Sequence, residues 1–286
     1  MRLAAVLALA ACSHDRAPID REAARGVFEE VRIDAPPGMS DLTLDDRGVI
    51  WAISERDRQV LELTLGKPPI RHALDGIPDG VDTEGLAWLA PGQFAIGTEG
   101  ADAPTASIMF AELRGDRLVA TRTRPLGNAE LGVELAVNHG IEALCGREGE
   151  LLAACETVGK LPDGTRFAPI VRLRGDGGDV TSMTKLRLTT DKGKISAMTC
   201  TLADDGTAQV LAIERHYGVS RILKFTIHRD DREVTPVVVI DLQPILHDAF
   251  NLEGIVKLPD GRMVAINDNQ GATARGPTEL LVFAPR

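Results

Sequence analysis

Two sets of polar side chains recur along the sequence, and most of them are carboxylates. They lie at the two ends of five similar segments, which are Ser40 to Glu55, Glu84 to Glu99, Glu142 to Glu156, Ser196 to Glu214 and Glu253 to Asp268. Eight of these ten end positions are acidic and the other two are serines. Grouped carboxylate oxygens suit a hard cation such as Ca²⁺, which takes about six to eight oxygen ligands. The repeated positions therefore predict a cation-binding site, provided that the fold brings them together.

Each segment predicts a β-hairpin whose two ends lie side by side. An apolar run, a turn with Gly and a second apolar run form the hairpin signature, as around Asp260 and Gly261. Counting outward from the turns places three pairs of carboxylates opposite each other, Glu84 with Glu99, Glu142 with Glu156 and Glu253 with Asp268. Directly opposed β-carbons lie about 5 Å apart. Such close like charges require a bound cation, a neighbouring Arg or Lys, or a raised pKa on one carboxyl.

The residues between successive hairpins contain further strand-like runs, so each hairpin is part of a larger repeated unit. Beyond each hairpin lies a third strand-like run, and most copies have a fourth, which is the make-up of a propeller blade. The last copy lacks its fourth strand, but an unassigned strand-like run at Gly26 to Asp34 precedes the first copy. We therefore predict an all-β fold, a single β-propeller of five four-stranded blades, closed by the N-terminal strand completing the last blade. Six blades are the alternative.

A propeller would gather all ten repeated positions around one mouth of its central channel. The metal ligands are expected to come from the set Glu84, Glu142, Glu253, Asp268, Glu99, Glu156 and Glu214. A structural interpretation stays open for the positions that end the second strands, because a carboxylate there can accept N–H bonds from the following loop. The innermost positions are less uniform, since Ser40 and Ser196 replace the acid. That variation favours a specialised site.

Two loop residues complete the set of candidate catalytic side chains, which is Glu253, Glu84, Arg215 and His139. Arg215 directly follows a repeated Glu, and its guanidinium can neutralise that acid or bind an anionic substrate through two hydrogen bonds. His139 precedes Glu142 and can transfer protons near neutral pH. The alternative for His139 is that it is an ordinary solvated loop residue.

The N-terminal residues have a different character from the rest of the chain. Arg2 is followed by an apolar run from Leu3 to Ala11 and then by Cys12, the layout of a secretory signal. The stretch Leu9 to Cys12 resembles a bacterial lipoprotein box. We expect a signal peptide at 1–11, a lipidated Cys12 with a tether at 12–25, and the propeller at 26–286. The apolar run is shorter than the about 20 residues that span a bilayer, so only acyl chains would hold this exported protein at the cell envelope.

Composition and cysteine use narrow the function further. The net charge of −10 and the 3% of aromatic residues argue against nucleic-acid binding. A monomer that acts on a small molecule is expected. Serine-triad and zinc-protease chemistry have no motif to support them. Export permits a disulfide, and Cys145 with Cys155 is the expected pair, although three small buried thiols are the favoured alternative.

Four stretches in order resemble the phytase-like, or "esterase-like activity of phytase", family. They are VDTEGLAWLAPGQFAIGTEG, HGIEALCGREGELLAACE, VLAIERHYGVSRILKF and NLEGIVKLPDGRMVAINDNQG. The resemblance covers most of residues 30–286 and implies an exported propeller with ester or phosphoester hydrolase activity. Our leading hypothesis is a Ca²⁺-dependent hydrolase, because the cation and Arg215 could join an acidic mouth to an anionic substrate. The rival hypothesis is a non-catalytic propeller that binds a ligand or partner at the envelope.

Overall fold

The computed structural model describes residues 19–55, 57–174, 177–247, 250–270 and 276–285. The predicted signal peptide and Cys12 lie outside these residues. Within them, regular structure is almost entirely β-strand, with one short helix, α1 (Asn128–Leu131). None of the described helices is long and apolar enough to cross a membrane.

The strands follow each other as antiparallel runs of four. The first run is β2 (Met39–Leu44), β3 (Ile50–Ser54), β4 (Gln59–Leu63) and β5 (Ile70–Asp75). The second is β6 (Val81–Ala90), β7 (Gln93–Gly100), β8 (Ala106–Arg114) and β9 (Arg117–Leu126), joined to the first by parallel pairing of β5 with β9. The third is β10 (Ile141–Arg147), β11 (Glu150–Cys155), β13 (Arg166–Arg174) and β14 (Val180–Arg187). Two short strands extend this sheet, β12 (Gly159–Lys160) beside β13 and β18 (Glu233–Val234) beside β14.

The last two runs bring the ends of the chain together. One is β15 (Lys194–Leu202), β16 (Ala208–His216), β17 (Val219–Ile227) and β19 (Val237–Asp241). The other joins β20 (Asn251–Lys257), β21 (Met263–Asp268) and β22 (Glu279–Phe283) to β1 (Phe28–Arg32). Phe28 pairs with Phe283 and Arg32 with Glu279, so the N-terminal strand lies at the outer edge of the C-terminal sheet.

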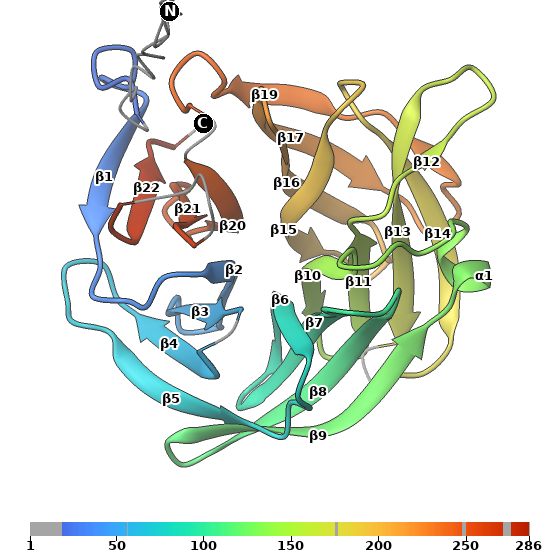
Figure 1. Ribbon diagram of the computed structural model, residues 1–286, viewed down its shortest axis with the longest axis horizontal. Coiled ribbons are helices and arrows are strands. Elements are labelled where there is room, and N and C mark those ends of the chain that lie inside the picture. The colour runs from blue at the N-terminus through green and yellow to red at the C-terminus, as the bar shows by residue number, and fades with distance from the viewer. Residues whose placement is uncertain (1–18, 56, 175–176, 248–249, 271–275, 286) are drawn as a thin grey trace, which may run out of the picture.

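The sheets stand around a common centre in a β-propeller-like arrangement (Figure 1). The first strand of each run is innermost. These innermost strands contact one another in the order β2, β6, β10, β15, β20 and again β2. Their beginnings therefore surround one end of a central axis.

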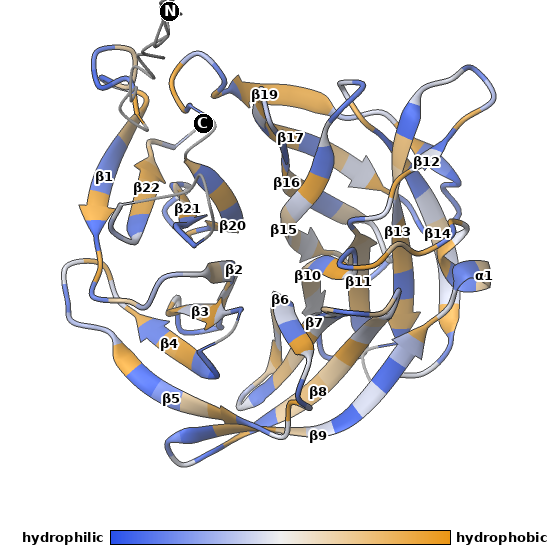
Figure 2. Cartoon of the chain, in the orientation of Figure 1, coloured by the Kyte–Doolittle hydropathy of each residue, from blue (hydrophilic) through white to orange (hydrophobic). Residues whose placement is uncertain are grey.

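Hydrophobic clusters fill the spaces between successive sheets. Leu42 and Leu61 of the first run pack against Val264 and Leu280 of the last. The alternation of apolar and polar residues along the strands is visible in Figure 2. Burial of apolar side chains on both faces is what holds the sheets together. From Ile19 onward the chain also lies against this body, because Ile19 bridges to Leu246 and is buried in the cluster of the last two runs.

All five innermost strands carry a β-bulge at the same place, and this corrects the expected pairing of carboxylates. The extra residue is in turn Ser40, Glu84, Glu142, Ser196 and Glu253. A bulge leaves its residue outside the register and re-aims the side chain. Glu99 therefore lies opposite Asp82, and Asp268 lies opposite Asn251. The prediction of directly opposed Glu84–Glu99, Glu142–Glu156 and Glu253–Asp268 pairs was wrong, because counting from the turn assumes no inserted residue.

The cysteine pairing also differs from the expectation. The disulfide joins Cys145 on β10 to Cys200 on β15, while Cys155 is a free, buried thiol. Within its hairpin Cys145 faces Leu152, and Cys155 faces Ile141. At about 3.3 Å per residue, these two cysteines are too far apart along the strands for a disulfide. Both the Cys145–Cys155 prediction and the alternative of three free thiols were wrong, since the partner comes from the neighbouring innermost strand.

Candidate functional site

The five bulges place their side chains at the same end of the innermost strands, which we call the acidic mouth. Glu84, Glu142 and Glu253 are each at most 9% exposed there. Burial, opposed in part by the neighbouring cations, raises the pKa of Glu142 and that of Glu253 from 4.5 to about 7. Burial and the nearby Glu142 raise the pKa of Glu84 well above 4.5. Such groups are poised to bind a cation, which would remove the penalty on their charged forms.

The two serines at bulge positions have a structural role in this arrangement. The Ser40 hydroxyl donates to the carbonyl oxygen of Thr83 on β6 at 2.7 Å. The Ser196 hydroxyl donates to the carbonyl oxygen of Leu252 on β20 at 3.0 Å. Each serine thus links its innermost strand to a neighbouring one, which fixes the position of the adjacent glutamate.

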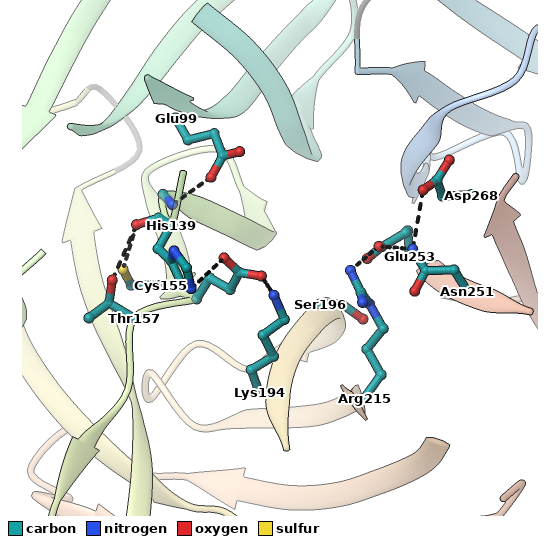
Figure 3. A network of polar contacts seen from close by, with 12 residues as sticks. Glu99, His139, Cys155, Thr157, Lys194, Ser196, Arg215, Asn251, Glu253 and Asp268 are labelled. Carbon is teal, nitrogen blue, oxygen red and sulfur yellow. Dashed lines mark hydrogen bonds and ion pairs between the residues drawn. The ribbon is translucent and has the colours of Figure 1, made fainter. Parts of the chain in front are cut away.

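One half of the mouth is organised around Glu253 (Figure 3). Its Oε1 accepts hydrogen bonds from the guanidinium of Arg215 and from Nδ2 of Asn251, the latter at 2.7 Å. Asn251 Nδ2 also lies 3.2 Å from Oδ2 of Asp268. Oε2 of Glu253 is buried and has no hydrogen-bond partner. A buried carboxylate oxygen without a partner is costly, and a cation bound at this atom would offset that cost.

The other half of the mouth joins Glu99, Glu142 and Glu156. One carboxylate oxygen from each lies within 4.8 Å of the others, and all three residues are buried. Glu99 accepts the N–H of Gly140 at 3.0 Å, and burial raises its pKa to about 7. Glu156 forms an ion pair with Lys194 and lies 3.7 Å from Nε2 of His139. Glu55, Asp82 and Glu84 form a further group of the same kind beside them.

Lys194 was not among the predicted residues, although the repeat contains a signal for it. It stands two residues before Ser196, at the position that Asp82 and Asn251 occupy in other copies. The position two residues before the bulge residue reaches the mouth because the bulge shifts the strand register beside it. Burial and the neighbouring Arg215 lower the pKa of Lys194. A lysine and an arginine therefore stand among the carboxylates.

Asp41, a second residue absent from the predictions, lies deeper between two innermost strands. It is fully buried, and its two oxygens accept the N–H groups of Leu42 at 2.7 Å and Leu86 at 2.8 Å. Burial raises its pKa well above 3.8. A short polar side chain that bonds to adjacent backbone gives no distinctive sequence signal, so Asp41 is identifiable only from the fold.

Glu214 lies outside the group that the mouth brings together. Its carboxylate accepts hydrogen bonds from the N–H and hydroxyl groups of Thr189 and of Thr190, at 2.5 to 3.2 Å. Glu214 is fully buried under that loop. The structural alternative therefore describes this residue, while Glu84, Glu142, Glu253, Glu99, Glu156 and Asp268 remain at the mouth.

The donor set fits a hard cation. It offers carboxylate oxygens from several innermost strands, an amide at Asn251, and the partnerless Oε2 of Glu253. Oxygen donors of this kind suit Ca²⁺ rather than a softer metal. The positive side chains of Lys194 and Arg215 reduce the repulsion among the carboxylates but leave Oε2 of Glu253 without a partner.

Residues 36–271 match the family described as phytase-like, "Esterase-like activity of phytase". The chain belongs to the phytase-like family. Residues 36–271 include all ten repeated positions, those of the acidic mouth among them. No curated protein matches the chain.

Solved structures show that the phytase-like chain shares its fold with distant proteins. The PQQ-bound aldose sugar dehydrogenase of Streptomyces coelicolor is 12% identical, with 90% of this chain and 98% of that chain covered and a TM-score of 0.50. A putative glucose dehydrogenase of Thermus thermophilus is 10% identical, with 90% of this chain and 100% of that chain covered and a TM-score of 0.51. RS223 β-xylosidase is 12% identical, with 90% of this chain and 98% of that chain covered and a TM-score of 0.53. At these identities the likeness concerns the fold alone.

Proposed function

We propose that this phytase-like protein is a metal-dependent hydrolase of ester or phosphoester bonds, with its site at the acidic mouth. The observation that carries the proposal is the convergence of Glu84, Glu142 and Glu253 from three identical bulges around a buried, partnerless Oε2. Evenly repeated architecture does not require buried glutamates at these positions, since serine occupies the other two. Family membership supports the reaction class.

The acidic residues would hold Ca²⁺ between them. Glu84, Glu142 and Glu253 are the central donors, and Glu99, Glu156 and Asp268 stand beside them. Bound Ca²⁺ would supply a positive charge that polarises a carbonyl or phosphoryl oxygen. Arg215 sits at the same place and would orient an anionic group of the substrate through its planar guanidinium.

His139 is arranged to accept a proton at the rim. Its Nδ1 lies 2.9 Å from the carbonyl oxygen of Val137, and because a carbonyl only accepts, Nδ1 carries the proton. Nε2 is then the basic atom, and Glu156 at 3.7 Å would stabilise the imidazolium that forms. With 41% of its side chain exposed, His139 can exchange protons with water.

The proposal includes the setting of the protein. We propose five blades, one for each bulge, with β1 completing the last blade, which the pairing of β1 with β22 supports. We also propose export as a lipoprotein held by acyl chains on Cys12, on the strength of the N-terminal sequence.

Turnover of a panel of esters and phosphoesters tests the proposal. We expect activity that EDTA removes and Ca²⁺ restores, and that Glu253→Gln lowers by about 10²-fold or more. Glu112→Gln, which alters a surface ion pair with Arg114, is the matched control and should leave activity unchanged. Absence of turnover on every substrate, with or without Ca²⁺, would contradict hydrolysis and favour a non-catalytic binding propeller.

A further inference from the structure

A separate cavity lies at the far end of the innermost strands, and we call it the basal cavity. Its volume is about 480 Å³, and all five innermost strands contribute to its wall. Small-molecule sites typically occupy about 300–1,000 Å³. The cavity is therefore large enough for a ligand of ordinary size.

The strand positions show that the basal cavity is distinct from the acidic mouth. On β20, Glu253 belongs to the mouth, whereas Lys257 lines the cavity. Four residues of a strand separate them by about 13 Å. On β10 the same relationship holds between Glu142 at the mouth and Cys145, whose disulfide to Cys200 forms part of the cavity wall. A ligand in the basal cavity would not touch the candidate catalytic residues.

The wall of the basal cavity combines apolar surface with positive charge. Leu144, Met198 and Val210 are buried apolar residues of this wall. Its charged members among the described residues are Lys224 and Lys257, and no acidic side chain lines it. This is unusual in a chain with 42 acidic and 32 basic residues. Within the described part of the chain neither lysine has an ion pair, so both positive charges are available to an anion.

We propose that the basal cavity binds a single-chain anionic amphiphile, a fatty-acid carboxylate. The alkyl chain would lie against the apolar wall, since burial of methylene groups is favourable. The carboxylate would lie at the exposed ammonium groups of Lys224 and Lys257. Charge complementarity selects an anionic amphiphile over a neutral one of equal length.

Fluorescence titration with 11-(dansylamino)undecanoate tests this proposal. Trp88 lines the cavity and is one of two tryptophans in the chain, so bound dansyl groups should receive energy from it. We expect saturable binding, displacement by laurate at concentrations about tenfold or more below those needed for dodecanol, and weaker energy transfer in Trp88→Phe. Binding should persist in Glu253→Gln, which separates this site from the proposed hydrolase.

The lysines supply the decisive variants. The double variant Lys224→Gln with Lys257→Gln should weaken laurate binding about tenfold or more. The control is a double variant at two exposed lysines elsewhere, Lys67→Gln with Lys160→Gln, which loses the same charge. Laurate binding to this control should change little. Thermal unfolding checks that each variant is folded. Absence of saturable binding, equal competition by dodecanol, energy transfer unaffected by Trp88→Phe, or equal binding in the two double variants would each overturn the proposal.

Discussion

Lys194 and Arg215 are directly opposed on the neighbouring strands β15 and β16, although both carry positive charge. Each is held by a different carboxylate, Lys194 by Glu156 and Arg215 by Glu253 (Figure 3). Two like charges in register are destabilising by themselves. The surrounding carboxylates reverse this effect, so the two cations and the acidic residues stabilise one another.

Removal of Arg215 should destabilise the fold in a pH-dependent way. Arg215→Met leaves the buried Glu253 without its cation, and we expect the free energy of unfolding to fall by about 1–3 kcal/mol at pH 8. The loss should be smaller at pH 5.5, where Glu253 can be protonated. Urea unfolding at both pH values measures it. Arg114→Met, at an exposed pair with Glu112, should cost less than about 0.5 kcal/mol at either pH.

The metal-free protein should lose stability as pH rises. Burial raises the pKa of Glu99, Glu142 and Glu253 from 4.5 to about 7, so between these values the folded state binds more protons than the unfolded state. The stability contributed by these protons is present below about pH 4.5 and is lost as pH rises through 7. Urea unfolding in EDTA from pH 5 to pH 8 should show this trend, and Glu142→Gln should flatten it. A rise in stability over the same range would contradict the assigned pKa directions.

Variants at the two repeated glutamates Glu214 and Glu253 should differ in how much Ca²⁺ raises their melting temperature. Glu214→Gln replaces one of the two oxygens that accept hydrogen bonds from Thr189 and Thr190 with an NH₂ group, which should lower stability by about 1–3 kcal/mol. The Ca²⁺-dependent rise in melting temperature should be kept. Glu253→Gln should lose most of that rise. Thermal unfolding with and without Ca²⁺ compares the two. If both variants kept the same Ca²⁺ response, Glu253 would not be a ligand.

The disulfide should contribute to stability by joining two innermost strands. Cys145 and Cys200 are 55 residues apart, and a bridge over a loop of this size typically contributes about 2–4 kcal/mol. Unfolding under reducing and non-reducing conditions measures the difference. Cys155→Ala should show the same difference as the wild type, since Cys155 takes no part in the bridge. A reduced protein as stable as the oxidised one would exclude this role.

The hairpins, the strand runs and the location of the mouth follow from the sequence because turns and alternating apolar residues recur at regular spacing. The bulges do not, because no residue type marks an inserted residue in these strands, yet the insertion leaves Glu84 and Glu253 outside the register that the turns predict. Lys194 and Asp41 were missed because their partners, Glu156 and the backbone of Leu86, come from other strands or from loops beyond them. The Cys145–Cys200 bridge likewise depends on which innermost strands are adjacent, which no local pattern specifies.

The central claim is that the acidic mouth binds Ca²⁺, and calorimetric titration of the metal-stripped protein at pH 7 tests it most directly. Carboxylates with pKa values near 7 must lose protons when they bind a cation. We therefore predict saturable binding with measurable proton release, detected as a heat that depends on the buffer's ionisation enthalpy, and loss of both in Glu253→Gln. Absence of saturable Ca²⁺ binding, or binding that is unchanged in Glu253→Gln, would contradict the account.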